Sequence, residues 1–534
     1  MPIQAQTVQY GPWNMGVRYD VPAEDVPANG LHGMENTRLT QSAAIERALG
    51  TTSYGSQSAI SGTPTLTACG EFRVPGGSEQ VFIVAGDTMY RYNSGADPAV
   101  WAEIMPASGV TITAGNDNTF EWCRAFTTLI LTNGVNGPIK WVGGSSDCAA
   151  LDVDSRFTTA EHCAFFDNRV WMANTNANKD RVWYSDIGDP ETWGASSYFN
   201  FGSPVTGIQT VQNSLVIHTE DFISVLIPTG NATIPYQQQQ KTSTDPRNPQ
   251  HGGTISGRAI VTIPGMNAQI FPMDDGIYMW SGGEVIEKVS YALDVYWDEI
   301  NKSRLHQSHA VYFADQNEVW FWLPYNDSTN SNNATNMNHV MVMSLKNRYK
   351  DENTGEVRFA WYGPLTGATT TFERNCSAII SDKPHAGTFS GKLLDHQPTG
   401  DNRYSHEAVA YNSNFETGAP AAFGGSTDLR WLYARAYYDG LGDFELTIDQ
   451  DSQGISGSSS KIRTTGGGGT FPVSLDTDTV GTLRMVSKDI DLSGYDPHSS
   501  LKFTNNEKNE PYRVRRTLLQ AKVLGLHRKP KAGV

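Results

Sequence analysis

The stretch VWMANTNANKDRVWYSD (Val170–Asp186) consists of an apolar strand, a polar turn rich in Asn and Asp, and a second strand that carries aromatic side chains. Turn residues of this kind adopt the positive φ that a tight hairpin requires. The pattern returns at intervals of roughly 40 to 55 residues, a spacing typical of propeller blades rather than helical solenoids. The further copies are VFIVAGDTMYRY (Val81–Tyr92), LILTNGVNGPIKWV (Leu129–Val142), LVIHTEDFISVL (Leu215–Leu226), QIFPMDDGIYMWSGG (Gln269–Gly283) and VWFWLPY (Val319–Tyr325).

An apolar strand suits a position that neighbouring sheets cover on both faces, so we expect it to be the inner strand of each pair. The sequence therefore predicts an all-β protein in which residues 63–399 form a β-propeller of six or seven blades. Alternation and β-branched or aromatic content support the individual strands. The predicted strands are Gln80–Ala85, Thr88–Tyr92, Thr128–Thr132, Ile139–Val142, Arg169–Ala173, Arg181–Ser185, Leu215–His218, Ile223–Ile227, Ile277–Trp280, Val319–Leu323 and Val340–Ser344.

Two further regions flank this propeller. Residues 1–62 are rich in Pro, Gly and Asn and predict an extended arm that lies on the rest of the chain, with one short helix at Ser42–Leu49. Residues 400–534 contain amphipathic strands that begin at Arg430, Asp443 and Thr482, and predict a small β-sheet or β-sandwich domain. The Gly/Ser-rich segment Ser452–Phe471 predicts a loop, and Tyr291–Ile300 predicts a short helix within the propeller.

The chain has 534 residues, with 40 Lys and Arg against 56 Asp and Glu, and a formal net charge of −16. Tight, sequence-independent binding of nucleic acid depends on cations that contact phosphates, so the composition argues against it. No apolar run approaches the roughly 18 residues of a membrane span, and the N-terminus lacks the pattern of a secretory signal. We expect synthesis in a cytoplasm and no membrane span.

Five cysteines, with no Cys-x-x-Cys pair among them, predict buried free thiols rather than disulfides or a zinc site. They are Cys69, Cys123, Cys148, Cys163 and Cys376.

The sequence patterns that could indicate catalysis or cofactor binding each depart from the motif that they resemble. HAGTFSGKLL (His385–Leu394) is one residue too short for a phosphate loop and predicts a hairpin turn. His306 and His309 have no acidic third ligand in register for a metal. Asp449–Gly454 opens like a calcium loop, but Ser460 stands where the bidentate Glu belongs, so a β-turn is favoured. We predict no enzymatic activity, no cofactor and no bound metal.

One phrase, YSDIGDPETW (Tyr184–Trp193), approaches the Asp box of propeller glycosidases, Ser-x-Asp-x-Gly-x-x-Trp. Ile187 occupies the position of the required Asp, so the match fails by register. An Asp box in any case stabilises a turn and takes no part in catalysis.

The segment Pro511–Val534 is basic and contains no acidic residue. It predicts contact with an acidic partner surface or with phosphate, and the alternative is an edge strand protected by positive charge. The candidate contact residues are Arg513, Arg515, Arg516, Arg528 and Lys529.

Several phrases together resemble the β-propeller tail proteins of tailed bacteriophages, either the tail nozzle (tail tubular protein B) or the tail hub that stabilises packaged DNA. The resemblance lies in FFDNRVWMAN…KDRVWYSDIGDPETW (Phe165–Trp193), VTGIQTVQNSLVIHTEDFISVL (Val205–Leu226), DDGIYMWSGGEVIEKVS (Asp274–Ser290) and the arm Gly11–Thr51. The resemblance covers about residues 1–400, whereas residues 400–534 resemble these proteins only in their general sequence pattern. Nozzle proteins are usually longer and carry extra distal domains, so the alternatives for this shorter chain are a hub, a stopper or an adaptor-proximal ring.

The resemblance implies a structural virion protein of the tail, assembled in the host cytoplasm as a homo-oligomeric ring of six copies. Portal-proximal adaptor proteins and distal tail proteins would be its neighbours, and the ring would retain the genome or conduct it during DNA ejection. DNA would pass without specific binding, past acidic side chains that line the bore, while the basic C-terminal strands would face a neighbouring subunit or tail protein. Two alternatives remain open at this point. A carbohydrate- or host-surface-binding propeller would need exposed aromatic platforms, and a secreted propeller hydrolase would need an acid pair.

Overall fold

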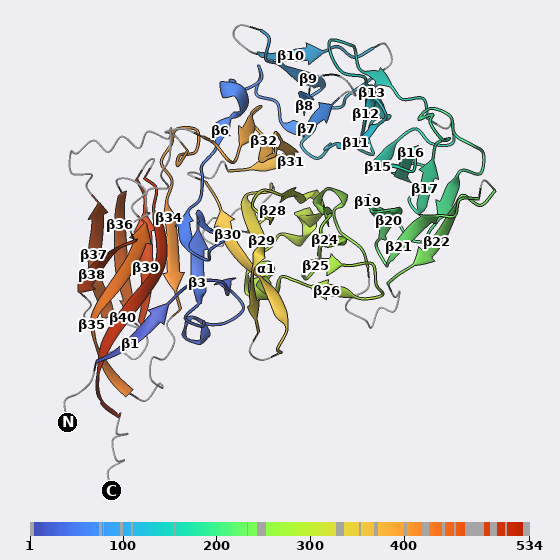
Figure 1. Ribbon diagram of the computed structural model, residues 1–534. Helices are drawn as coiled ribbons and strands as arrows, with labels where there is room; N and C mark the ends of the chain where they lie inside the picture. Colours follow the sequence, from blue (N-terminus) through green and yellow to red (C-terminus); the bar gives the residue numbers. More distant parts are fainter. Residues whose placement is uncertain are drawn as a thin grey trace, which may run out of the picture.

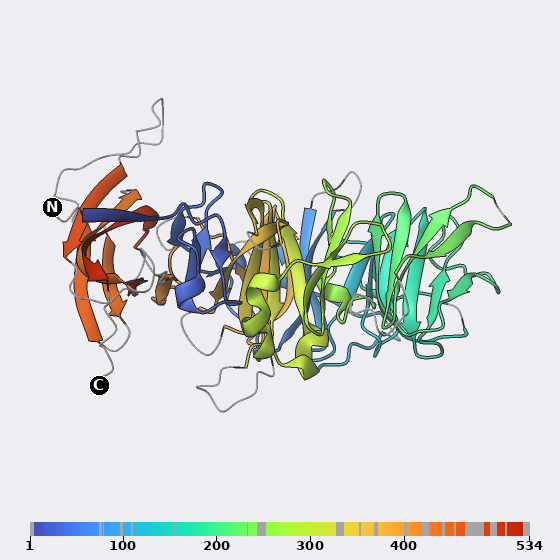
Figure 2. The same cartoon turned by 90° about the horizontal axis from the view of Figure 1, so that it is seen from below.

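Figures 1 and 2 show the computed structural model, in which a ring of small sheets lies beside a second group of longer strands. The structure describes residues 5–73, 77, 79–96, 100–107, 110–153, 155–231, 233–242, 252–326, 336–351, 354–367, 372–399, 403–418, 427–439, 444–452, 455–464, 485–491, 499–507 and 510–526.

Seven antiparallel four-stranded units form the ring, so the predicted β-propeller is confirmed, with seven blades (Figure 1). Blade I consists of β7(Leu66–Arg73), β8(Glu79–Ala85), β9(Thr88–Asn93) and β10(Val100–Ile104). Blade II consists of β11(Glu121–Ala125), β12(Thr128–Thr132), β13(Ile139–Trp141) and β14(Ala149–Ala150). Blade III consists of β15(Ala160–Phe166), β16(Arg169–Thr175), β17(Arg181–Tyr184) and β18(Tyr198–Asn200). Blades IV and V are β19(Val205–Val211), β20(Ser214–Thr219), β21(Ile223–Pro228) and β22(Tyr236–Gln240); and β23(Val261–Ile263), β24(Ala268–Met273), β25(Gly276–Trp280) and β26(Ile286–Lys288). Blades VI and VII are β27(His309–Phe313), β28(Glu318–Leu323), β29(His339–Lys350) and β30(Val357–Leu365); and β31(Arg374–Ile380), β32(Lys383–Thr388), β33(Leu393–Asp395) and the remote β6(Thr52–Ser53).

Continuous apolar strands arise because each blade is packed between two others. In β16, Val170 and Met172 belong to a buried cluster shared with blade II, whereas Trp171 and Ala173 belong to one shared with blade IV. Successive side chains of a strand point to opposite faces, so both faces must be apolar. Each predicted propeller strand coincides with an observed one to within one or two residues, except Val340–Ser344, which is the first part of the longer strand β29.

The apolar strand lies inside the aromatic strand that follows it, as predicted, but a further strand lies inside both. The first strand of each blade faces the propeller axis, and the apolar strand is the second one out. Strands that converge on an axis leave little room, so small residues are required there. A Cβ on Gly70 would lie 2.6 Å from Trp122 Cζ2, and one on Gly207 would lie 2.5 Å from Ile260 Cδ1.

The ring is closed by a strand from the other end of the sequence. β6 pairs with β33, with Ser53 opposite Leu394, so the fourth strand of blade VII comes from residues that precede blade I. A buried cluster that includes Leu66 and Ile83 of blade I and Cys376 and Ile380 of blade VII seals the junction. β6 thereby covers the outer edge of β33 and ties the start of the propeller to its end.

Beyond blade VI, the sheet continues into strands from both ends of the chain. β30 pairs with β2(Gly16–Val17), and the order runs on through β3(Gly30–Glu35), β34(Ser413–Thr417), β39(Ser499–Asn505), β36(Phe444–Ser452) and β37(Ile455–Thr464), which makes a ten-stranded sheet. A six-stranded sheet lies beside it and contains β38(Met485–Asp491), β35(Thr427–Asp439), β40(Arg513–Leu526), β5(Ile45–Arg47), β4(Thr37–Leu39) and β1(Ala5–Tyr10). We call the parts of these two sheets outside blade VI the terminal sheets; Figure 2 shows them at one side of the propeller.

Helices are few and short in the described residues. They are η1(Ala23–Asp25), η2(Tyr54–Ser56), η3(Gly257–Ala259), η4(Tyr291–Leu293), α1(Asp294–Asp298) and η5(Lys302–Gln307). The helix predicted at Tyr291–Ile300 is present as η4 and α1. None of the helices in these parts of the chain is long and apolar enough to cross a membrane.

Two local predictions in the terminal sheets are wrong. The helix expected at Ser42–Leu49 is replaced by the strand β5, because pairing with β4 and β40 outweighs a weak helical propensity. The loop expected at Ser452–Phe471 contains β37, whose main chain pairs with β36; residues 465–471 lie outside the described residues. Of the turn predicted at Asp449–Gly454, residues 449–452 instead belong to β36, whereas Gln453 and Gly454 lie outside the described residues.

Candidate functional site

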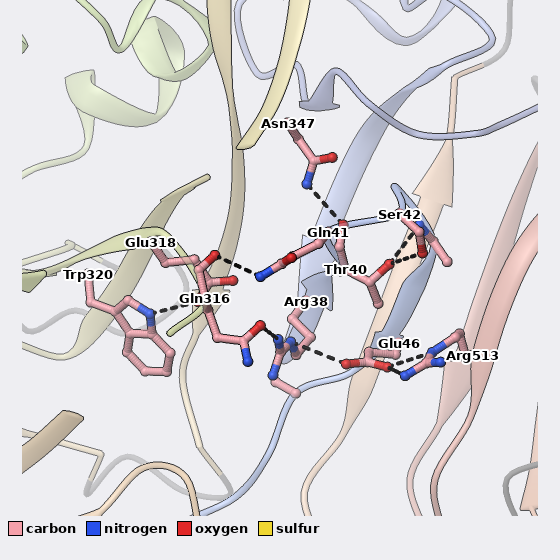
Figure 3. A network of polar contacts seen from close by, with 12 residues as sticks. Arg38, Thr40, Gln41, Ser42, Glu46, Gln316, Glu318, Trp320, Asn347 and Arg513 are labelled. Carbon is pink, nitrogen blue, oxygen red and sulfur yellow. Dashed lines mark hydrogen bonds and ion pairs between the residues drawn. The ribbon is translucent and has the colours of Figure 1, made fainter. Parts of the chain in front are cut away.

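The N-terminal segment joins the propeller to the basic strand β40 through a network of polar contacts (Figure 3). Arg38 on β4 donates from Nη2 to Gln316 Oε1 of blade VI at 3.1 Å, and its Nε lies 3.3 Å from Glu46 Oε1. On the other side of the Glu46 carboxylate, Arg513 Nε donates to Oε2 at 2.7 Å. One carboxylate is therefore shared by two arginines that come from opposite ends of the chain.

The electrostatics of this network depend on burial. Glu318 is 2% exposed and accepts a hydrogen bond from Trp320 Nε1 at 3.1 Å. Burial raises the pKa of Glu318, and the positive charge of Arg38 opposes that rise. Burial by itself lowers the pKa of Arg38, but the charges of Glu318 and Glu46 outweigh it and raise the pKa. The arginine therefore stays charged, pairs with Glu46 and interacts electrostatically with Glu318.

Further polar contacts fasten the same segment to blade VI. Asn347 Nδ2 donates to the Thr40 carbonyl at 2.9 Å, and Lys346 Nζ donates to Gln41 Oε1 at 2.6 Å. The segment thus contacts the propeller on one side and β40 on the other, in agreement with the views in Figures 1 and 3.

Arg47 is the buried anchor of the terminal sheets, with 1% exposure. Its Nη1 donates to Asn505 Oδ1 at 2.8 Å and to the Glu510 carbonyl at 3.1 Å, and its Nη2 donates to the Tyr411 carbonyl at 2.8 Å. The guanidinium also lies 4.3 Å from the centre of the Tyr411 ring. A planar, five-donor group suits a site where several carbonyls converge.

The five basic residues predicted to contact a partner do not share one location. Arg513 is bound within the chain to Glu46. Arg515 and Arg516 line a hollow of about 330 Å³ together with Gln9, Pro12, Ser42 and Ala44. Arg528 and Lys529 lie outside the described residues.

The axis of the propeller is narrow and polar. Its centre is a hollow of about 170 Å³, and one mouth is a hollow of about 130 Å³. Arg258 closes the axis by donating to the carbonyls of Gln307 at 2.7 Å and Asn375 at 3.0 Å. Spaces of this size hold a few water molecules.

A buried ion pair lies at the mouth of the axis. His162 Nδ1 lies 3.0 Å from Glu121 Oε1. Burial by itself lowers the pKa of His162, but the adjacent Glu121 carboxylate outweighs it and raises the pKa to about 9. His162 is therefore positively charged at neutral pH.

The histidines considered as metal ligands are separated by their elements. His306 is exposed within η5, whereas His309 starts β27 in the interior, where its Nδ1 lies 2.7 Å from Ser377 Oγ. Across the described ranges, no group of three or more His, Cys, Asp or Glu side chains could hold a metal ion. The segment His385–Leu394 forms the predicted hairpin, since β32 pairs with β33.

The cysteines are free thiols, as predicted. Cys69, Cys148, Cys163 and Cys376 are buried, and Cys123 is partly exposed.

Sequence reasoning missed Arg38, Glu46 and Arg47, which join the N-terminal segment to the propeller and to the terminal sheets. Their segment, ENTRLTQSAAIER (Glu35–Arg47), carries no motif, and apart from the Arg38–Glu46 pair the residues gain their partners from parts of the chain more than 250 residues away. Alternating charged and apolar residues at Ile45–Arg47 were the only available signal for a strand there.

No family model and no curated protein matches the sequence. The chain is similar in structure to YCF48 bound to D1 peptide, with 10% identity, 63% of this chain and 95% of that chain covered, and a TM-score of 0.39. It is also similar to the Pan2 WD40 domain of Neurospora crassa (8% identity, 68% and 98% covered, TM-score 0.37) and to YCF48 from Cyanidioschyzon merolae (8% identity, 65% and 98% covered, TM-score 0.37). The seven blades described above identify the fold from the chain's own strand pairing.

Proposed function

We propose that this chain is a structural virion protein of a tailed bacteriophage, which forms a ring of six copies in the tail beside the portal adaptor. The ring conducts or retains the genome during DNA ejection and contacts adaptor and distal tail proteins. The sequence phrases in Phe165–Trp193, Val205–Leu226 and Gly11–Thr51 suggest this class of protein.

The structural observation that best supports the proposal is the ten-stranded sheet that begins in blade VI and ends in β37. Because hydrogen-bonded strands run from the propeller into the terminal sheets without a linker, force applied to one part passes to the other through a sheet. Both ends of the chain are built into these strands, so neither β1 nor β40 can be pulled away without breaking a sheet. Such a subunit suits a particle that must resist packaged DNA.

The axis of a single propeller is too narrow to be the path of DNA. Hollows of about 170 and 130 Å³ cannot admit a nucleic acid. A channel for DNA would therefore lie between copies of the chain, with the propellers arranged around it. The net charge of −16 favours passage over binding, because each phosphate–cation contact would hold the moving DNA.

The carbohydrate-binding alternative needs aromatic platforms on the surface. Within the described residues, the large hydrophobic side chains that are exposed are aliphatic, such as Ile187 at 66% and Val285 at 65%. We therefore retain the ring as the proposed function.

The test is the oligomeric state of the purified full-length chain. Size-exclusion chromatography with light scattering and negative-stain microscopy should give closed rings of uniform mass. A monodisperse monomer at every concentration tested, above all one that binds glycans, would refute the proposal.

A further inference from the structure

Two arginines of β40 line the hollow beside this strand because a β-bulge interrupts the strand register. β40 pairs with β35 such that Arg516 lies opposite Tyr437 and Val514 opposite Tyr438, which leaves Arg515 as the extra residue of a β-bulge. Consecutive residues of a regular strand point to opposite faces, but a bulge re-aims one of them. As a result, both Arg515 and Arg516 line the same hollow.

Arg516 is held in position and is not fully satisfied. Its guanidinium carbon lies 4.5 Å from the centre of the Tyr437 ring. Its Nε is buried, and no group in the described part of the chain accepts a hydrogen bond from it. A stacked guanidinium keeps its N–H donors in a fixed plane, which suits a carboxylate.

The surroundings of the hollow define what would fit it. Glu46, the nearby carboxylate of the polar network, is already shared by Arg38 and Arg513. Pro12 and Ala44 add apolar surface to the lining. An occupant with a carboxylate next to an aliphatic side chain would meet both kinds of surface.

The loop after β17 carries that combination in a rigid form. Ile187 is the most exposed of the large hydrophobic side chains in the described residues, at 66%, and Asp186 and Asp189 beside it are also exposed. Asp189 accepts hydrogen bonds from Glu191 N at 2.9 Å and Thr192 Oγ1 at 2.8 Å, and Gly188 N donates to the Asn168 carbonyl at 2.9 Å. A loop fixed in this way loses little entropy when it binds.

The position of this loop suits contact between copies. β17 lies on the far side of the propeller from β40 and β1 (Figure 1). A head-to-tail ring requires two different, complementary patches on each copy. We propose that the acidic loop 186–189 of one copy docks in the Arg515–Arg516 hollow of the next copy, an inference that rests on the proposed ring.

A charge swap tests this docking in the full-length chain. Arg516→Asp and Asp186→Arg should each lower the fraction of chains in rings about tenfold, because each places like charges together. The double variant R516D/D186R should recover most of the rings. Arg124→Asp, a charge reversal at an exposed arginine on β11, is the matched control and should assemble normally.

Two results would overturn the docking. Either single variant could assemble like the wild type, or the double variant could assemble no better than both singles. Circular dichroism melts show whether R516D still folds, and D186R changes only an exposed loop, so its result stands even if R516D is unstable. Wild-type rings that ignore these substitutions would refute this contact alone, whereas a wild-type monomer would refute the proposed function.

Discussion

The propeller is antiparallel and so are the terminal sheets, apart from β2, which pairs in parallel with β3 and β30, yet the two regions are assembled in opposite ways. In blade III, Trp171 pairs with Tyr184 across a hairpin. In the six-stranded terminal sheet, Tyr10 pairs with Thr517, across almost the whole length of the chain. Blades I to VI each take their four strands from one stretch of sequence, whereas the terminal sheets take theirs from both ends.

This difference predicts how stability is distributed. Contacts between residues that are close in the sequence cost little loop-closure entropy, whereas contacts between remote residues cost more and form later. We expect the blades to tolerate local damage and the terminal sheets to depend on a few anchors. Four substitutions or conditions test that expectation.

The largest effect is expected at Arg47, in the terminal sheets. Arg47→Met keeps the bulk of the side chain but leaves the buried Tyr411 and Glu510 carbonyls without their donors. We expect a loss of about 4 kcal/mol in the free energy of unfolding. Hydrogen exchange should show that β34, β39 and β40 lose protection first, while guanidinium denaturation measures the size of the loss.

The exposed Arg124→Met is the control for that substitution and should change the free energy of unfolding by less than about 0.5 kcal/mol. Equal loss of protection in blades and terminal sheets would contradict the division between the two regions.

The second largest loss of stability is expected at acid pH, through His406, which lies between blade VII and the N-terminal arm. Its Nδ1 lies 3.1 Å from Thr51 Oγ1, and burial, followed by the charges of Arg374 and Arg47, lowers its pKa from 6.5 to about 3. A folded pKa below the unfolded one means that stability is fully present above pH 6.5 and is lost as the pH falls toward 3. The loss attributable to His406 is on the order of 3 kcal/mol.

The measurement is the free energy of unfolding of His406→Gln and of the wild type between pH 4 and 7. The variant should depend less steeply on pH than the wild type. Identical slopes would show that His406 does not titrate as the structure indicates.

Alkali should act in the opposite sense, through His162 inside the propeller. Its pKa is raised to about 9, because the Glu121 carboxylate outweighs the effect of burial. Stability from this pair is fully present below pH 6.5 and is lost as the pH rises through 9, by an amount on the order of 2 kcal/mol. His162→Gln should flatten the dependence of unfolding free energy on pH between 6.5 and 9; an unchanged slope would exclude the charged pair.

The smallest effect is expected at Gly207, on the inner strand β19. Gly207→Ala would place a Cβ 2.5 Å from Ile260 Cδ1 and 3.0 Å from Gly257 Cα, so the inner strand must shift. We expect a loss of about 1–2 kcal/mol in thermal or chemical unfolding. Gly265→Ala, where no atom lies within 4 Å of the added Cβ, should leave stability nearly unchanged. A larger loss at Gly207 than at Arg47 would invert the proposed order of the two regions.

Sequence reasoning located the blades because their information is local. Val81–Tyr92 and Val170–Asp186 contain strand, turn and strand within one short phrase, and the observed strands β8, β9, β16 and β17 agree. The strand that lies nearest the axis was not identified, because an apolar run shows that both faces are covered but not how far the strand lies from the axis. Ser42–Leu49 was mistaken for a helix, because the partners of β5 lie elsewhere in the chain.

The candidate contact residues were predicted only in part. A run of positive charge marked β40, but it could not separate Arg513, which Glu46 binds within the chain, from Arg515 and Arg516, which the bulge turns toward the hollow.

The sequence by itself determined a repeated β-hairpin chain with covered apolar strands and a negative charge, because alternation, turn residues and composition act over short distances. Tertiary structure alone decided that residues 52–53 complete blade VII, that β1 pairs with β40, and that Glu46 joins two arginines. Those pairings depend on which edges meet once the ring has closed, and no local property of the chain specifies that meeting.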